Sequence, residues 1–339
     1  VEVGQLAIVM VFLPLAFALR RTAFYRRAVL VAGSLVIATI AAIWLAERGW
    51  RVTASDISAN ALARVGADPA PASDVAASEA VTARAALEID LRRAIEEQQF
   101  VLHFQPQLDA DDRVIGGEAL LRWQHPTRGL VPPNEFIRAA EETGLIIPIG
   151  QWVLDTVCQQ LAVWSATPAL AQLSIALNVS ARQFHNADFI FHVIAALKRS
   201  GANPQRLKLE LTESLLLDDI EDVIEKMNML KELGTGFSLD DFGTGYSSLS
   251  YLKRLPLDQL KIDQSFVRDV LTDANDASIA RTVVVLAQNL GLSVIAEGVE
   301  TEGQRAFLIA NGCRAFQGYL FSRPLPLADF EAYVSARTS

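Results

Sequence analysis

The chain has 339 residues, of which 51% are hydrophobic and 20% charged, and its formal net charge is −9. The length allows one large, well-buried domain and a smaller segment, while the acidic balance argues against a nucleic-acid polymer as partner, because such a partner needs a basic surface. The two cysteines, Cys158 and Cys313, cannot form a disulfide framework and suit a reducing compartment, where we expect them to be packing residues.

Two apolar runs near the start predict membrane attachment through residues 1–50. The run at 28–46 is uncharged and 19 residues long, close to the roughly 20 residues that a spanning helix needs. A buried soluble helix is its alternative. The run at 6–19 is shorter and contains Pro14. A signal peptide is the alternative for this first run, but its basic residues follow the apolar stretch instead of preceding it.

The orientation of these runs stays open. Four arginines, at positions 20, 21, 26 and 27, lie between them, and the positive-inside rule places such residues in the cytoplasm. If both runs spanned the membrane, the remainder of the chain would then face outward. Either the first run does not span, or further spans precede the first residue, or the rule fails here.

Residues 51–81 are rich in Ala, Pro, Ser and Asp and predict a linker. The helical spacing of Leu87, Leu91 and Ile95 then opens the main domain, for which we expect the bounds 82–339.

From residue 98 onward, short apolar runs alternate with longer amphipathic ones, as strands and helices do in an α/β fold. Three of the helical runs end in glycine, the usual residue after a helix C-terminus. Eight strands alternating with helices over roughly 250 residues predict a (β/α)8 TIM-type barrel, with a doubly wound open sheet as the alternative. The expected strands are 100–106, 114–123, 173–180, 207–213, 236–241, 257–263, 292–298 and 313–319.

Polar residues stand in or just after seven of these strands. Taken singly, each would usually be a solvated residue at the rim of the sheet. Their repetition predicts one shared site, because the C-terminal ends of barrel strands meet at one face. The residues are Glu118, Asn178, Glu210, Asp240, Asp241, Lys261, Glu297 and Gln317.

Five of these side chains are carboxylates and only one is a lysine, so they stay ionised together only if cations neutralise them. Carboxylate and amide oxygens without His or Cys suit Mg²⁺ or Mn²⁺ and not zinc. Neighbouring side chains in a strand point to opposite faces, so we expect the strand to end at Asp240 and the loop to begin at Asp241. Both acids could then flank two ions about 3.5–4 Å apart, the two-metal geometry of phosphoester hydrolysis.

The blocks around these residues resemble the EAL-domain family of bacterial cyclic-di-GMP phosphodiesterases. The resemblance extends from about Leu87 to Tyr333 and comprises, not in chain order, GGEALLRW, FQP, NVSARQF, ELTES, DDFGTGYSSLSYL, LKID, AEGVE and FQGY. It implies a modified (β/α)8 barrel that hydrolyses cyclic di-GMP to linear pGpG with two Mg²⁺ or Mn²⁺ ions and so lowers the cellular level of this messenger.

The resemblance also implies a role for each residue. The ligands of one metal ion would be Glu118, Asn178, Glu210 and Asp240. The ligands of the second, directly or through water, would be Asp240, Asp241 and Glu297. Lys261 would orient or polarise the attacking water and Gln317 would help to position it, while the general base is not decided.

Further residues are implied to contact the substrate or to support the site. The substrate contacts would be Gln105, Arg122 and, more weakly, Asp263. Arg122 suits a phosphate through its planar donor fork. Glu213 would steady the loop after Asp241, with a helix N-cap as its alternative role.

By the same resemblance we expect a homodimer that forms near the loop after Asp241, inhibition by Ca²⁺, and localisation at the bacterial inner membrane with the catalytic domain in the cytoplasm. Two other functions stay open: a catalytically silent cyclic-di-GMP receptor coupled to the membrane segment, and a scaffold for protein interactions. Every expected metal ligand is present, which favours the enzyme.

Overall fold

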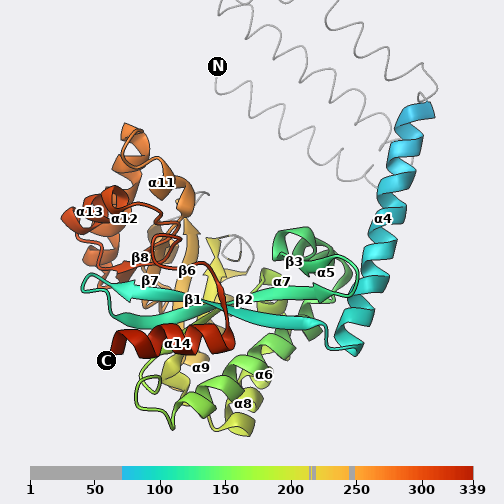
Figure 1. Ribbon diagram of the computed structural model, residues 1–339, viewed down its shortest axis with the longest axis horizontal. Coiled ribbons are helices and arrows are strands. Elements are labelled where there is room, and N and C mark those ends of the chain that lie inside the picture. The colour runs from blue at the N-terminus through green and yellow to red at the C-terminus, as the bar shows by residue number, and fades with distance from the viewer. Residues whose placement is uncertain (1–70, 214, 216–218, 244–248, 339) are drawn as a thin grey trace, which may run out of the picture. The chain divides into compact units, whose positions relative to one another are not determined.

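The computed structural model describes residues 71–213, 215, 219–243 and 249–338 (Figure 1). The chain divides into two compact units, Val1–Glu79 and Ala80–Ser339. Both predicted membrane runs, and the part of the predicted linker before residue 71, lie outside the described residues. Among the helices that are described, none is long and apolar enough to cross a membrane.

The first described helix, α4 (Pro71–Glu96), begins within the segment predicted to be a linker. The composition of this segment, rich in Ala, Pro, Ser and Asp, predicted a linker. Pro71, however, is the first residue of the helix, where its missing N–H removes no hydrogen bond. Alanine, frequent in this stretch, is the strongest helix former. The last part of the predicted linker is therefore helical.

Eight strands form a closed barrel, and each corresponds to a predicted strand. They are β1 (Phe100–Asp109), β2 (Val114–His125), β4 (Ser174–Asn178), β5 (Leu207–Thr212), β6 (Gly236–Phe242), β7 (Gln259–Ile262), β8 (Ser293–Ala296) and β9 (Ala315–Phe316). Around the barrel the order is β1, β9, β8, β7, β6, β5, β4 and β2, and β2 pairs again with β1. The pairs from β2 to β9 are parallel, whereas β1 is antiparallel to both its barrel neighbours. The fold is thus a (β/α)8 barrel modified by one reversed strand.

Two short strands that the sequence did not predict extend this sheet. They are β3 (Gly129–Val131), which pairs with the outer end of β2, and β10 (Leu325–Pro326), which pairs with β1. Both are too short for an alternating pattern to be recognised in the sequence.

The long helices lie outside the barrel (Figure 1). The longer amphipathic runs of the sequence form α6 (Ile146–Trp164), α8 (Phe189–Ser200), α9 (Ile220–Glu232) and α12 (Ala274–Leu290). The caps after α8 and α12 are Gly201 and Gly291 in the left-handed conformation, as the terminal glycines predicted. The remaining helices are η1 (Pro133–Glu135), α5 (Ile137–Thr143), α7 (Ala181–Phe184), η2 (Pro204–Arg206), α10 (Leu249–Leu252), α11 (Gln264–Arg268), α13 (Glu302–Ala310) and α14 (Leu327–Thr338).

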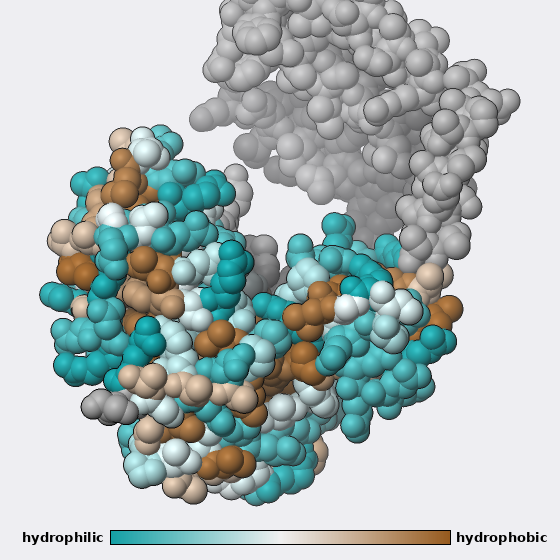
Figure 2. Space-filling view, viewed as in Figure 1, coloured by the Kyte–Doolittle hydropathy of each residue, from teal (hydrophilic) through white to brown (hydrophobic). Residues whose placement is uncertain are grey.

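Two hydrophobic cores lie in the described residues of the unit Ala80–Ser339. The larger lies between the barrel strands and the surrounding helices. The smaller joins Leu91 and Ala94 of α4 to Phe100, Trp123 and Phe136, and the outer halves of β1 and β2 reach it (Figure 1). Hydrophobic residues on the visible face gather in several groups among hydrophilic ones (Figure 2).

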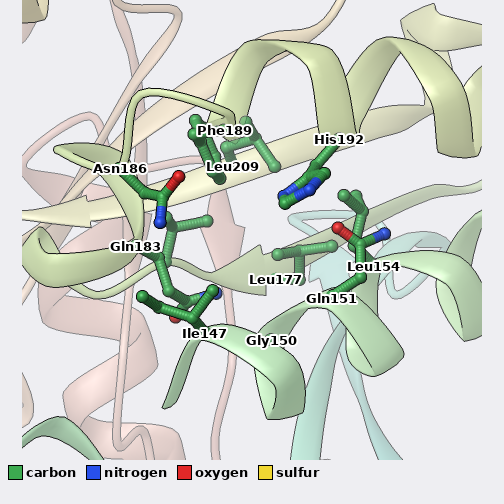
Figure 3. A pocket seen from close by; sticks show the side chains of 11 residues that line it. Ile147, Gly150, Gln151, Leu154, Leu177, Gln183, Asn186, Phe189, His192 and Leu209 are labelled. Atoms are coloured by element: carbon green, nitrogen blue, oxygen red, sulfur yellow. The ribbon is translucent and has the colours of Figure 1, made fainter. Parts of the chain in front are cut away.

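A cavity of about 20 Å³ lies between the barrel wall and the helices α6 and α8. Figure 3 shows the side chains of Gln151, Gln183, Asn186 and His192 among the apolar ones that line it. Its volume has room for about one water molecule. This cavity belongs to the packing outside the barrel and is separate from the polar residues described next.

Candidate active site

Strand alternation places the polar side chains inside the barrel. In β5, Leu207, Leu209 and Leu211 belong to the core beneath the helices, so Lys208 and Glu210 point to the opposite face, toward the barrel axis. The same alternation in the neighbouring strands directs the predicted site residues inward. The barrel interior is therefore polar at its C-terminal end.

The ammonium group of Lys261, on β7, is the centre of the site. Its Nζ lies 2.5 Å from Glu210 Oε2 and 2.6 Å from Glu297 Oε1. It also lies 3.2 Å from Asp240 Oδ2 and 3.7 Å from Glu118 Oε2. Lys261 itself is fully buried. Four carboxylates that are far apart in sequence thus converge on one lysine.

The charges of this cluster influence one another strongly. Burial alone would lower the pKa of Lys261, but the four carboxylates outweigh it and hold this pKa well above its ordinary value. Burial raises the pKa of Glu210 well above its usual range and that of Glu297 to about 8, although Lys261 opposes both shifts. The lysine therefore stays charged at neutral pH, and one ammonium does not fully neutralise its partners.

The carboxylates face Lys261 Nζ. In the described part of the chain, no group of three His, Cys, Asp or Glu side chains has the geometry of a metal site. The chemistry of the site nevertheless fits added cations. Glu210 Oε1 is buried and has no hydrogen-bond partner in the structure. Such an oxygen calls for a proton or a cation, and oxygen donors of this kind suit Mg²⁺ or Mn²⁺.

Asp240 and Asp241 are adjacent, and a local distortion of β6 alters the alternation between them. The strand continues to Phe242, one residue beyond the expected bounds 236–241, so the prediction that the strand ends at Asp240 and the loop begins at Asp241 was wrong. Asp241 instead adopts a left-handed conformation, with φ of 54°, and the pairing register with β7 shifts between Leu239 and Phe242. Its N–H donates to Asp240 Oδ1 at 2.9 Å. Burial, together with Asp240 and other nearby acids, raises the pKa of Asp241 to about 6.

Amide side chains hold Glu118 from two sides. Asn178 Nδ2 donates to Glu118 Oε1 at 2.6 Å, and Gln317 Nε2 donates to Glu118 Oε2 at 2.6 Å. Gln317 Nε2 also donates to Gln105 Oε1 at 3.2 Å. Gln105 in turn donates to the carbonyl of Ser322 at 3.1 Å. The predicted ligands Glu118 and Asn178, the predicted water-positioning residue and one predicted substrate contact therefore form one network.

The other predicted residues lie around this cluster with local partners. Arg122 Nη1 donates to the carbonyl of its neighbour Leu121, and burial lowers the pKa of its guanidinium group. Asp263 caps helix α11 by accepting from the backbone N–H of Ser265 at 3.0 Å. The structure thus gives a cap role to a residue for which the sequence suggested only a substrate contact.

Glu213 accepts a hydrogen bond from the backbone N–H of Gly243 at 3.0 Å. It therefore touches the chain immediately before residues 244–248, which lie outside the described residues. Its role in supporting that loop stays a prediction.

A cleft of about 710 Å³ opens beside the cluster, within the range of about 300–1,000 Å³ typical of small-molecule sites. Its lining includes Leu120 of β2, Asn178 of β4, Ile137 of α5, Ile146 of α6 and Arg182 of α7. The sequence did not predict the helical side of this cleft. Its lining residues on α5, α6 and α7 are mostly apolar and do not stand at the ends of strands, where the polar pattern was found.

Polar residues deeper in the barrel interior were also missed, among them the buried Gln107 and the half-buried Lys208. Gln107 lies two residues beyond Gln105 in β1 and donates to Gln317 Oε1 at 2.9 Å. Lys208 lies two residues before Glu210 in β5 and donates to Gln259 Oε1 at 2.9 Å. A spacing of two from a predicted site residue, in the same strand, was the available signal.

Two known protein families match parts of this sequence. The EAL domain model matches residues 88–324. The chain belongs to the EAL domain family. A second family model, that of the HupE / UreJ protein, matches residues 1–48, which the structure does not describe.

Individual relatives of this EAL domain chain are similar over the same region. The bifunctional diguanylate cyclase/cyclic di-GMP phosphodiesterase MucR of Pseudomonas aeruginosa is 47% identical over 247 residues, covering 73% of this chain and 36% of that protein. The cyclic di-GMP phosphodiesterase PdeR of Escherichia coli K12 is 43% identical, covering 73% of this chain and 37% of that protein. The chain thus spans about a third of the length of these curated relatives.

Solved structures agree in fold. The PaMucR phosphodiesterase, in complex with c-di-GMP, superposes with a TM-score of 0.70 and 46% identity, covering 72% of this chain and 99% of that one. The EAL domain of Mycobacterium smegmatis DcpA superposes with a TM-score of 0.59 and 34% identity, covering 70% and 96%.

Proposed function

We propose that the barrel domain hydrolyses cyclic di-GMP to linear pGpG. The observation that carries this proposal is the convergence of four carboxylates on the buried Lys261 at the C-terminal mouth of the barrel. Similarity to relatives that are named cyclic di-GMP phosphodiesterases, and to a solved complex with c-di-GMP, supports the choice of substrate.

Two divalent cations, Mg²⁺ or Mn²⁺, would complete the site. One would be held by Glu118, Asn178, Glu210 and Asp240. The other would be held by Asp240, Asp241 and Glu297. When bound, the ions would polarise the phosphoryl oxygens and activate water for attack on phosphorus. The surplus of carboxylates over ammonium groups and the unpartnered oxygen of Glu210 support this arrangement.

Lys261 would orient the reacting groups. Four carboxylates keep its ammonium group charged, and the barrel wall fixes its position. A fixed positive charge can offset the negative charge that develops at the phosphate without reorganising during the reaction. In hydrolysis the oxygen of water forms a bond to phosphorus, one phosphoester bond breaks, and the leaving oxygen gains a proton.

The cleft beside Asn178 would receive the dinucleotide. Its apolar lining, which includes Leu120 and Ile137, offers surfaces for the purine bases, while the charged lining consists of Arg182 together with Glu141 and Glu142. The anionic phosphates would then lie toward the cations at the carboxylate cluster.

The test is a hydrolysis assay on the full chain with Mg²⁺ or Mn²⁺, in which chromatography separates cyclic di-GMP from pGpG. We expect Asp240→Asn to lose turnover by at least about a hundredfold, because it weakens both metal positions. Asp111→Asn is a matched control: it changes an exposed aspartate of the β1–β2 turn, and we expect full activity. Binding of cyclic di-GMP without any pGpG would contradict hydrolysis and favour the receptor function.

We further propose that residues 1–50 attach the chain to the bacterial inner membrane, with the barrel in the cytoplasm. The two apolar runs and the match to the HupE / UreJ family support this. Fractionation of cells that express the full chain or a chain lacking residues 1–50 tests it, since only the full chain should sediment with membranes. Homodimer formation and inhibition by Ca²⁺ stay predictions.

A further inference from the structure

We infer that Gln107 is a positioning residue, which holds the side-chain amide of Gln317 in the orientation that presents its NH₂ group to Glu118. This inference rests on the proposed function for its effect on turnover. The underlying contact is a hydrogen bond of 2.9 Å from Gln107 Nε2 to Gln317 Oε1, between two side chains that are each 4% exposed.

The direction of every amide in this network follows from its two ends. At one end Gln105 Nε2 donates to the backbone carbonyl of Ser322, which can only accept. At the other end Gln317 Nε2 faces the carboxylate of Glu118, which also accepts when ionised. The Oε1 atoms of Gln105 and Gln317 must therefore receive donors. Gln317 donates to the first, and Gln107 donates to the second.

The strands leave room for Gln107 to reach this position. Its side chain points into the barrel because it lies two residues from Gln105 in β1. The residue paired with it in β2 is Gly116. A Cβ atom built on Gly116 would lie 2.4 Å from the carbonyl oxygen of Ser174 and 3.5 Å from Gln107 Oε1. The glycine thus permits close approach of β2 to β4, while the space above it leaves Gln107 at an ordinary van der Waals distance.

Gln107 differs from the other two partners of Gln317 because it has no expected ligand of its own. Glu118 is a proposed metal ligand and Gln105 a proposed substrate contact, so both would change partners as the site is loaded. The bond to Gln107 does not depend on either event. We therefore assign to Gln107 the task of keeping the Gln317 amide in one orientation throughout turnover.

The experiment compares the full chain with Gln107→Met, which keeps the volume of the side chain but removes the donor. We expect kcat to fall about tenfold while the dissociation constant of cyclic di-GMP changes less than about twofold. Gln107→Glu should be slower still, because a carboxylate would accept from the NH₂ group of Gln317 and turn the amide away from Glu118. Gln259→Met is the matched control, since Gln259 is equally buried in the barrel but bonds Lys208 and Ser238.

A double variant separates this role from a merely structural one. If Gln107 acts through Gln317, adding Gln107→Met to Gln317→Met should lower kcat no further. Independent, multiplicative losses in the two variants, or full activity of Gln107→Met, would overturn the inference.

A second readout is independent of turnover. In the chain with ¹⁵N-labelled glutamine, the NH₂ signal of Gln317 should lose protection from hydrogen exchange in Gln107→Met and keep it in Gln259→Met. An unchanged signal in Gln107→Met refutes the inference even if the chain has no activity. Absence of hydrolysis by the unmodified chain refutes only the proposed function.

Discussion

Two lysines, the fully buried Lys261 and the half-buried Lys208, point into the same barrel, and their pKa values shift in opposite directions. Burial by itself lowers the pKa of both Lys261 and Lys208. At Lys261 four carboxylates within 3.7 Å outweigh burial and raise the pKa. At Lys208 the attraction of Glu210 and Asp258 is too weak to do so, and the pKa stays lowered. Burial of a lysine therefore does not identify a reactive position, whereas the number of carboxylates around its nitrogen does.

The partners differ in kind as well. The nitrogen of Lys208 donates to the neutral side chain of Gln259. The nitrogen of Lys261 instead contacts carboxylates of three other strands, β2, β5 and β6, and of Glu297, which follows β8. One lysine is a component of a structural hydrogen-bond network, and the other is the counter-charge of the proposed active site.

Replacing each lysine by methionine gives the largest contrast. In metal-free protein we expect Lys261→Met to lower the free energy of unfolding by about 3–5 kcal/mol, because it leaves several buried carboxylates without a cation. Lys208→Met should cost about 1 kcal/mol, the net value of one hydrogen bond. Urea unfolding monitored by circular dichroism measures both. Equal losses would mean that the two environments do not differ as described.

Divalent cations should stabilise the folded chain through the carboxylates around Lys261 and not through the surroundings of Lys208. With Mn²⁺ at about 100 times its dissociation constant, mass action predicts a gain of about 2.7 kcal/mol in the free energy of unfolding. Asp240→Asn should remove most of this gain, whereas Lys208→Met should retain it. Thermal unfolding with increasing Mn²⁺ gives the measurement, and a gain that persists in Asp240→Asn would place the cation elsewhere.

The raised carboxyl pKa values predict a smaller, pH-dependent effect in metal-free protein. The pKa of Glu297 is about 8 in the folded chain, against an ordinary value of 4.5. Between these values the folded chain binds more protons than the unfolded one, so stability falls as pH rises from about 5 to about 8. Glu297→Gln should flatten this decline relative to the unmodified chain, as urea midpoints across the pH range would reveal. An identical slope in the variant would contradict the raised pKa.

The smallest effect concerns Asp263, whose cap role and predicted substrate contact can be separated. Asparagine caps helices about as well as aspartate, so Asp263→Asn should change stability by less than about 0.5 kcal/mol, whereas Asp263→Ala should cost about 1 kcal/mol. If the residue is only a cap, KM for cyclic di-GMP in Asp263→Asn should equal that of the unmodified chain. A raised KM with unchanged stability would instead support the substrate contact.

The barrel and most of its polar centre could be predicted from the sequence, because each depends on a local pattern. Alternating apolar runs indicate strands, and a polar residue such as Glu210 or Lys261 at a strand end marks the face where parallel strands converge. The sequence blocks shared with the EAL-domain family, such as the one around Glu118, then indicated phosphodiester hydrolysis as the reaction. None of these inferences required knowledge of which strands are neighbours.

Tertiary structure decided the remaining features, since they depend on contacts between distant parts of the chain. The reversal of β1, the central place of Lys261 and the left-handed conformation of Asp241 all follow from how the strands close into a barrel. The bond from Gln107 to Gln317 joins residues 210 positions apart. Sequence alone therefore determined most of the polar groups at the mouth of the barrel. Closure of the sheet determined which of them touch, because side-chain distances across a barrel are set by strand order and register.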